Sequence, residues 1–273
     1  MKHKLEKILD MSNLLKVPTM AEMMAQGETP DVLFWVGCSG SFDDRAKKIT
    51  KAIVKILQNC KVKFAVLGAE ESCTGDPAKR AGNEFTFQMQ AMMNIQVLNG
   101  YEVKKIVTGC PHCFNTLKNE YPELGGEFEV IHHTEFLDEL LKSGKITVEG
   151  GAFEGKKITY HDSCYLGRSN DIYEAPRTLL SKLDNELSEM KKAKKNGLCC
   201  GAGGAQMFKE DEPGDKRINT ERIEGALETG AEIIATNCPF CTNMLTDGLK
   251  NVNQEENVKI YDVAELIVNA KDL

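Results

Sequence analysis

Short apolar runs alternate along the chain with longer segments in which apolar residues recur at helical spacing. The runs have the length of buried strands, and they predict seven strands, at residues 32–36, 63–67, 105–108, 129–132, 157–160, 232–236 and 258–261. Residues 44–57 predict a helix with one apolar face. Residues 83–98 predict a second helix, whose apolar residues include Met89, Met92 and Met93. Strands that alternate with helices predict an α/β fold with mainly parallel sheets.

The cysteines show that the chain contains an internal repeat. Four cysteines in each half have nearly the same spacing: Cys38, Cys73, Cys110 and Cys113, then Cys164, Cys199, Cys238 and Cys241. The first two of each set lie 35 positions apart, and each set ends in the pattern Cys-Pro-x-Cys. Because the residues around the close pairs also match, the pattern indicates one unit that occurs twice.

The repeat divides the chain at the glycine-containing loop 149–154. We expect a helical arm at residues 1–30, a first repeat at 31–150 and a second repeat at 151–273. The predicted fold is therefore α/β with two pseudo-symmetric repeats, each with a short parallel sheet and flanking helices. In the arm, Leu5, Ile8, Leu9 and the segment 20–24 are expected to pack on a core or on a partner.

Charge and composition exclude several classes of protein. No window approaches the ~18 consecutive apolar residues of a membrane span. A net charge of −7 argues against nucleic acid as a partner, because phosphate binding needs a basic field. The chain shows no signal peptide, so we expect a cytoplasmic protein, where ten cysteines indicate metal binding or redox chemistry. A local basic cluster is interpreted as a solvated helix end, with a docking patch as the alternative: Lys191, Lys192, Lys194 and Lys195.

The predicted strands place the cysteines in one region of the fold. Cys38, Cys110, Cys164 and Cys238 each follow a predicted strand, and loops at the carboxyl ends of parallel strands converge. The second half offers a fifth thiol, Cys200, where the first half has Thr74. Cys60 has no counterpart and is interpreted as a small structural thiol near a helix end.

The cysteine sets favour an iron–sulfur cluster over zinc. A tetrahedral zinc site needs four ligands, so the first set fits zinc and the five thiols of the second set exceed it. Thiolates in such numbers favour iron–sulfur clusters, and the ferredoxin spacing is absent. Gly201, Gly203 and Gly204 follow the cysteine pair and allow backbone N–H groups to approach sulfur.

The pattern Cys164…Cys199-Cys200-Gly201…Cys238-Pro239-Phe240-Cys241, with its degenerate upstream copy, resembles the CCG domain of heterodisulfide-reductase-like iron–sulfur oxidoreductases. Residues 71–77, 161–168 and 199–204 carry this resemblance, which covers residues from about 32 to 270. It implies that Cys164, Cys199, Cys200, Cys238 and Cys241 hold a noncubane [4Fe-4S] cluster. Because Thr74 replaces one ligand, the first site is expected to hold a different cluster, zinc or no metal.

Several other residues are candidates for roles near the metal. His161 and Asp162 are candidates for a proton relay, with a strand-end hydrogen bond as the alternative. His112 is expected beside a cluster rather than on it, because Phe240 holds the matching place. Arg80 and Arg168 are candidates to balance cluster charge. The remaining residues are assigned to the core, or in the case of the histidines to the core or its rim: Phe34, Trp35, His132 and His133.

The sequence thus predicts an iron–sulfur oxidoreductase subunit that transfers electrons. The resemblance implies a ferredoxin-type or flavin-containing partner as donor, and a disulfide, a heterodisulfide or a quinone-linked chain as acceptor. It also implies that a separate membrane subunit could hold the protein at the inner face of a membrane. The alternative is a non-enzymatic assembly subunit with structural zinc. A nucleotide-binding enzyme is disfavoured, because no Gly-Lys-Ser/Thr sequence follows the glycines.

Overall fold

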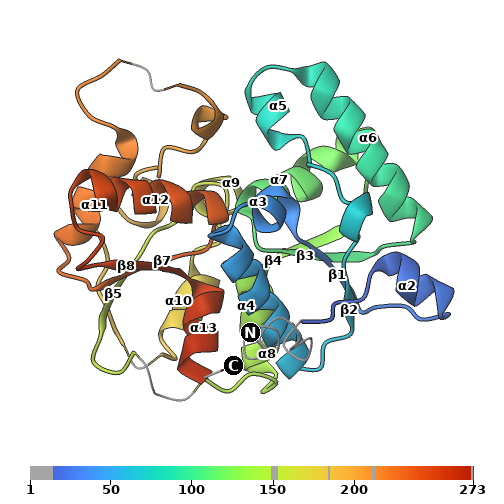
Figure 1. Cartoon of the computed structure of the whole chain (residues 1–273), viewed down its shortest axis with the longest axis horizontal. Helices are drawn as coiled ribbons and strands as arrows, with labels where there is room; N and C mark the ends of the chain where they lie inside the picture. The colour runs from blue at the N-terminus through green and yellow to red at the C-terminus, as the bar shows by residue number, and fades with distance from the viewer. Residues whose placement is uncertain (1–14, 149–152, 184, 211–212, 272) are drawn as a thin grey trace, which may run out of the picture.

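Each half of the chain builds a four-stranded parallel sheet, and the strand order is the same in both sheets (Figure 1). The computed structural model describes residues 15–148, 153–183, 185–210, 213–271 and 273. The first sheet runs β2 (Phe64–Ala65), β1 (Val32–Trp35), β3 (Lys105–Thr108) and β4 (Glu129–His132). The second runs β6 (Glu186–Leu187), β5 (Lys157–Tyr160), β7 (Ile233–Thr236) and β8 (Lys259–Asp262). The predicted α/β fold with two pseudo-symmetric repeats is confirmed.

All seven predicted strands are present, and the structure adds β6, which the sequence pattern did not predict. This strand has two residues, which pair with Lys157 and Ile158 of β5. Only one of them is apolar, so the segment has no apolar run that could have been recognised. The strand is needed to complete the match between the sheets, because it occupies the place that β2 has in the first half.

The helices of the first half are α2 (Met20–Ala25), α3 (Gly37–Phe42), α4 (Ala46–Asn59), α5 (Asp76–Arg80), α6 (Glu84–Gly100), α7 (Pro111–Asn115) and α8 (His133–Lys142). Those of the second half are α9 (Gly167–Asn170), α10 (Glu174–Leu180), α11 (Ile218–Leu227), α12 (Pro239–Asn251) and α13 (Val263–Lys271). Short helical turns of other types lie at Gly68–Glu70, Thr116–Glu120, Tyr121–Leu124, Lys194–Asn196 and Gln206–Phe208. Among the described residues, no helix has the length and apolar character needed to cross a membrane.

The two predicted helices correspond to α4 and α6. In α4 the apolar face packs in the core, with Ile49, Ile53 and Leu57 almost fully buried. In α6 the buried residues include Phe87, Ala91, Ile95 and Leu98, which recur every three or four positions. The three methionines of the predicted helix lie on its other faces and are 48–58% exposed, so they are not part of the core.

Four helices join the two halves. In the first half α4 follows β1 and α8 follows β4, and their counterparts after β5 and β8 are α10 and α13. Helix α4 packs on α13, and α8 packs on α10. These two contacts are equivalent, so the halves are related by approximate two-fold symmetry. Leucine, isoleucine and phenylalanine side chains from both halves form one continuous core there.

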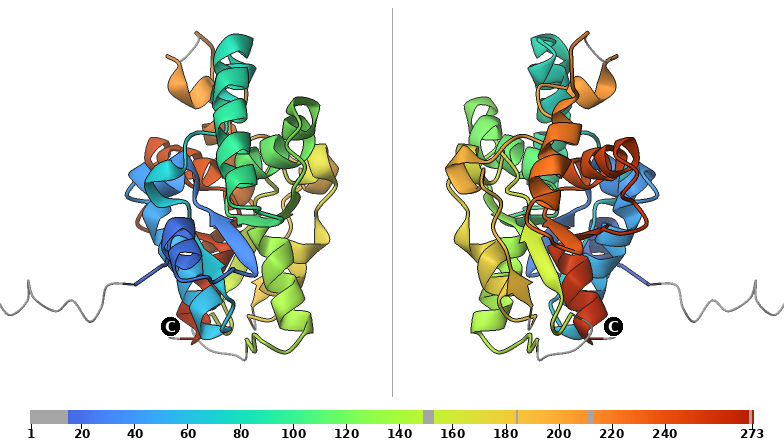
Figure 2. Two further views of the ribbon diagram at one scale, coloured as in Figure 1. Left: turned by 90° about the vertical axis from the view of Figure 1, so that its right-hand side faces the viewer. Right: turned by 90° about the vertical axis from the view of Figure 1, so that its left-hand side faces the viewer.

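The other large core cluster contains the cysteine loops. It gathers apolar residues of α2, α6, α11 and α12, together with buried thiols from both halves. Figure 2 shows α6 and the short turn Gln206–Phe208 standing above the sheets on one side of the molecule, away from the interface helices. The cysteine loops lie at the carboxyl ends of the strands, below these two projections.

The N-terminal arm packs on the first sheet through α2. Thr19 caps this helix with Glu22 and forms a β-bridge with Val66. Met20 and Met23 are buried, as expected for a segment that packs on the core, whereas Met24 is exposed. The predicted packing of Leu5, Ile8 and Leu9, and most of the glycine-containing loop 149–154, lie outside the described residues.

The lysine cluster lies in an irregular loop with one short turn, so the predicted helix end is wrong. Its solvated character is confirmed, because Lys191, Lys192 and Lys194 form exposed ion pairs with Glu228, Glu221 and Glu174. The loop is held in place by its backbone, since the N–H of Lys194 donates a hydrogen bond to the Asp162 carboxylate (2.7 Å).

Candidate metal centre

The segments after β1, β2 and β3, and those after β5, β6 and β7, bring nine cysteines of the two halves together. Five of these thiols are buried, and the remaining four are partly exposed: Cys38, Cys73, Cys164 and Cys199. Cys60 lies elsewhere, at the end of α4, where its thiol donates a hydrogen bond to the carbonyl of Lys145. The structure therefore confirms that Cys60 lies apart from the other cysteines.

The five thiols of the second half form a continuous chain of contacts. Cys164 contacts Cys199, which contacts Cys200; Cys241 joins Cys200 to Cys238. Hydrogen bonds from Cys164 and Cys200 hold the pKa of Cys199 well below its ordinary value, and the backbone N–H groups of Gly201 and Gly203 add to this effect. The Cys199 sulfur is thus built to carry a negative charge.

The first half repeats this arrangement around Cys73. A hydrogen bond from Cys38 lowers the pKa of Cys73 to about 7. Gly75 donates its N–H to the Cys73 sulfur at 3.5 Å, as Gly201 does to the Cys199 sulfur at 3.3 Å. Both glycines have left-handed backbone, with φ of +89° and +93°, which aims these N–H groups back at the sulfur.

Thr74 takes the place of Cys200 in space as well as in sequence. Its hydroxyl lies 4.0 Å from the Cys113 sulfur, and Cys200 contacts Cys241, the counterpart of Cys113. The first half therefore has four thiols and a hydroxyl where the second half has five thiols.

Of the three glycines that the sequence singled out, two act on sulfur. Gly201 and Gly203 direct their N–H groups to Cys199, as described above. Gly204 also has left-handed backbone, with φ of +67°, and a side chain built on it would extend into open space. Gly204 therefore allows the chain to turn and does not contact the thiols.

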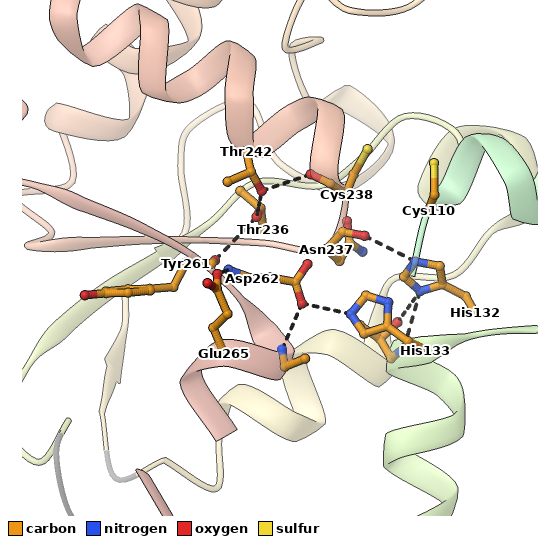
Figure 3. A network of polar contacts seen from close by, with 12 residues as sticks. Cys110, His132, His133, Thr236, Asn237, Cys238, Thr242, Tyr261, Asp262 and Glu265 are labelled. Atoms are coloured by element: carbon orange, nitrogen blue, oxygen red, sulfur yellow. Dashed lines mark hydrogen bonds and ion pairs between the residues drawn. The ribbon is translucent and has the colours of Figure 1, made fainter. Parts of the chain in front are cut away.

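The two cysteine sets meet between the halves. The thiol of Cys110 contacts that of Cys238, its counterpart in the second half (Figure 3). The rings of His112 and Phe240, also counterparts, pack edge to face with centroids 5.1 Å apart. Tyr165 covers the other side of His112 at 4.4 Å. The Nδ1–H of His112 is bonded to the Asp76 carboxylate (2.8 Å), so this ring lies beside the thiols with one nitrogen already engaged.

A second polar network joins the halves next to this contact (Figure 3). The Nε2–H of His132 donates to the carbonyl of Asn237, the residue before Cys238, and that of His133 donates to Asp262 (3.0 Å). Both histidines are fully buried, which confirms their assignment to the core. Burial also holds the pKa of His132 well below its ordinary value.

His161 faces the five-thiol set. A ring nitrogen of His161 and the sulfurs of Cys200 and Cys241 all lie within 4.8 Å of one another. The Nε2 of this ring is buried and has no hydrogen-bond partner among the described residues. Its Nδ1 accepts a hydrogen bond from Nε of Arg222 (2.9 Å). Burial, and then the charge of Arg222, lower the pKa of His161 to about 3, so the ring is neutral.

Asp162 takes part in a different network. Its two oxygens bind Nη1 and Nη2 of Arg177 at 2.8 and 3.0 Å, and Arg177 also binds Glu189. His161 and Asp162 are thus neighbours in sequence whose side chains have different partners. This geometry gives no support to a proton relay between them.

The arginines correct one expectation about charge. Arg80 pairs with the carboxylates of Asp76 and Glu120, so its charge is already balanced, and Arg168 is exposed. The arginine that approaches the thiols is Arg222 of α11, which the sequence pattern did not single out. No cysteine motif includes Arg222, so the sequence could have indicated this residue only through its position in the repeat.

The thiol sets suit an iron–sulfur cluster. Five sulfurs in one continuous chain of contacts exceed a tetrahedral zinc site, and N–H groups aimed at Cys199 are suited to anionic sulfur. The buried Nε2 of His161, which lacks a protein partner among the described residues, is suited to face such a cluster.

Comparison with known proteins agrees with this arrangement. The sequence profile of the CCG family, described as a cysteine-rich domain, matches residues 32–118 and 158–246. The chain is 46% identical to the "Probable iron-sulfur-binding oxidoreductase FadF" of Bacillus subtilis, over 93% of the chain and 36% of that protein. It is 44% identical to the "EtfAB:quinone oxidoreductase" of Syntrophomonas wolfei, over 90% and 35%.

A third relative is one of the subunits of the "Dihydromethanophenazine:CoB--CoM heterodisulfide reductase" of Methanosarcina barkeri, which is 34% identical over 89% of the chain and 59% of that protein. The chain thus spans between about a third and three fifths of the length of these relatives. The two profile matches cover more than half of the chain and coincide with the two structural repeats. The chain belongs to the CCG cysteine-rich domain family and carries two copies of that domain.

Proposed function

We propose that this chain is the electron-transferring module of an iron–sulfur oxidoreductase. The observation that carries the proposal is the continuous contact of five thiols in the second half: Cys164, Cys199, Cys200, Cys238 and Cys241. These residues would hold a [4Fe-4S] cluster of the noncubane type. The relatives support the iron–sulfur part of the proposal, since FadF is named as iron–sulfur-binding.

The first half would hold a separate metal group on four thiols, Cys38, Cys73, Cys110 and Cys113. The hydroxyl of Thr74 is a poor ligand for iron compared with a thiolate. We therefore propose a four-thiolate iron–sulfur cluster at this site, with zinc as the outcome that metal analysis would distinguish.

The protein's own residues provide the environment of the cluster. A bound cluster supplies one-electron transfer. Burial of Cys200, Cys238 and Cys241 excludes water from the inner side of the site, and the N–H groups of Gly201 and Gly203 stabilise negative charge on Cys199. Cys164 and Cys199 are partly exposed, so the outer side is the side that an acceptor can approach.

The name of one relative, an EtfAB:quinone oxidoreductase, supports a proposal for the electron donor and acceptor. We propose a flavin-containing or ferredoxin-type protein as donor, and a quinone-linked chain as acceptor. A disulfide or heterodisulfide is the second candidate acceptor, because two successive one-electron transfers can supply the two electrons of its reduction, while the two protons come from solvent. A quinone acceptor would place the protein at the inner face of a membrane through a partner.

We also propose that the domain boundaries follow the repeats, with residues 1–30 as an arm, 31–150 as the first repeat and 151–273 as the second. The repeated sheet order supports this division.

Metal analysis of anaerobically purified protein tests the proposed function. We expect iron, acid-labile sulfide and broad visible absorption, and stoichiometric zinc without sulfide would refute the cluster. The variant Cys200→Ser should lose the signal of the second site. Cys60→Ser is the matched control, because Cys60 lies outside both thiol sets and its replacement should leave the spectrum unchanged.

A further inference from the structure

Arg222 is a buried cation without a carboxylate partner among the described residues. The residue is 2% exposed. Nε donates to His161, Nη1 donates to the carbonyl of Lys192 (2.7 Å), and Nη2 has no partner within the described part of the chain. The acidic group that acts on it is Asp162, whose oxygens are both bound to Arg177. Since an unpaired buried charge is strongly unfavourable, negative charge must be supplied by another neighbour.

The neighbours that can supply this charge are thiolates. Burial lowers the pKa of Arg222, whereas negative charge on Cys241, Cys200 or Cys199 favours its charged form. The guanidinium groups of Arg177 and Arg80, which are buried or partly buried, have carboxylate partners. Arg222 therefore differs from them in facing sulfur instead of oxygen.

The repeat offers an internal comparison for this residue. Helix α11 precedes β7 as α6 precedes β3, and the buried positions Asn219, Arg222, Ile223 and Ala226 match Ala91, Asn94, Ile95 and Leu98. Asn94, the counterpart of Arg222, is a neutral amide that donates to the carbonyl of Cys73 and to Tyr121. The half with five thiols thus has a buried cation at a position where the half with four thiols has a neutral side chain.

The contact with Arg222 also fixes the hydrogen on His161. The guanidinium donates its Nε–H and keeps its proton, so Nδ1 of His161 must carry the lone pair. The neutral ring then carries its hydrogen on Nε2, which is buried without a partner among the described residues, in a ring that lies within 4.8 Å of the Cys200 and Cys241 sulfurs. A nitrogen in this state is a hydrogen-bond donor and cannot coordinate a metal.

A second ring N–H lies at the matching place of the first half. In the first sheet, Trp35 of β1 pairs with Thr108 of β3. In the second sheet, Tyr160 pairs with Ala235, so the next residue, His161, lies beside Thr236, the counterpart of Thr108. Trp35 is therefore the counterpart of His161. The Nε1–H of Trp35 is buried, has no partner among the described residues and belongs to the same apolar cluster as Cys110 and Cys113. A tryptophan N–H can only donate, which agrees with a donor role for this position.

We propose that Arg222 and His161 are positioning residues that set the reduction potential of the five-thiol site. Arg222 balances the charge of the additional thiolate, and His161 carries this influence to the sulfurs through an Nε2–H donor. This inference rests on the proposed function. Because reduction adds negative charge to a cluster, a nearby cation and a sulfur-directed donor both favour the reduced state.

Redox titration monitored by EPR tests the charge of Arg222. We expect Arg222→Gln to shift the one-electron reduction equilibrium at least tenfold toward the oxidised state, which corresponds to a decrease of about 59 mV. Arg222→Lys should retain most of the wild-type potential. Arg168→Gln is the matched control, because it removes a charge from an exposed arginine near Cys164 and should leave the potential unchanged.

The outcomes separate this inference from the proposed function. Wild-type protein without iron and sulfide would refute the function itself. A loaded Arg222→Gln variant with the wild-type potential would overturn only the role of Arg222. If Arg222→Gln loses the cluster while Arg222→Lys retains it, the requirement for a cation is supported.

If neither Arg222→Gln nor Arg222→Lys binds the cluster, a measurement on the wild-type protein still tests the inference. ENDOR spectroscopy with ¹⁵N-labelled histidine should show an exchangeable proton near the cluster and no nitrogen coupling of the size that direct coordination gives. The proton signal should disappear in D₂O, and His161→Phe should lose the part of it that comes from the ring while the N–H groups of Gly201 and Gly203 remain. A directly coordinated histidine nitrogen would overturn the assignment.

Discussion

The thiols of Cys110 and Cys238, which occupy the same place in the two repeats, are in contact between the halves (Figure 3). We expect Cys110→Ser to change the spectrum of the second site although Cys110 belongs to the first set, because the sulfur that it removes touches a ligand of the second. Cys38→Ser removes a first-set thiol on the outer side and should leave the second-site g-values unchanged. The comparison is made by EPR, and equal effects of the two variants would contradict the structural link.

The variant Thr74→Cys should complete the first thiol set. Thr74 lies beside Cys113 as Cys200 lies beside Cys241, so a cysteine there would reach the missing position. Compared with the wild-type protein, we expect the EPR signals that are typical of the second site to gain intensity. The iron content per chain should rise or stay equal. Thr74→Ser, which adds no thiol, is the control. An unchanged spectrum in a folded Thr74→Cys variant would show that the fifth thiol does not determine the cluster type.

The backbone of Gly201 should be more important for the site than that of Gly203. Gly201→Ala places a side chain at φ +93°, which costs about 1–2 kcal/mol, and it disturbs the N–H that binds Cys199. Gly203→Ala is the matched control, since its φ is not left-handed and its new methyl group would lie 4.0 Å from the Cys199 sulfur, an ordinary contact. Urea unfolding of the metal-free proteins gives the free-energy difference, and equal losses would argue against backbone strain.

Asp162 should be important for stability. Asp162→Ala leaves Arg177 with Glu189 as its remaining carboxylate partner and removes the acceptor of the Lys194 N–H. We expect a loss of about 3 kcal/mol, in the range found when one partner of a buried ion pair is removed. Lys192→Ala breaks only an exposed pair and should cost less than about 1 kcal/mol. Urea unfolding measures both, and a loss as small as that of the control would refute the structural role of Asp162.

The sequence was sufficient for the fold class and for the division of the cysteines, because both leave periodic signals. Strand runs such as 32–36 are recognisable from local apolar residues, and the repeat of Cys38 and Cys164 shows which loops must meet. Strand β6 and the exposed methionines of α6 could not be predicted in this way. A two-residue strand is defined by its neighbour, and which face of an apolar helix is buried depends on what packs on it.

The charged residues were the hardest to assign from sequence. Arg80 and Arg168 lie near cysteine motifs and were therefore candidates, but carboxylates or solvent already satisfy them. Arg222 lies on a helix between two motifs, and only the packing of α11 brings it to His161. For a charged side chain, the partner in space decides the role, and that partner is seldom close in sequence.

The methionines of α6 have a consequence for the handling of the protein. Met89, Met92 and Met93 present their thioethers to solvent on one helix, whereas Met20, Met23 and Met190 are buried. Oxygen-derived oxidants convert accessible methionine to the sulfoxide, which is polar and chemically stable unless it is enzymatically repaired. A peptide that contains residues 89–93 would therefore serve as an internal record of exposure to air, readable by mass spectrometry alongside the state of the thiols.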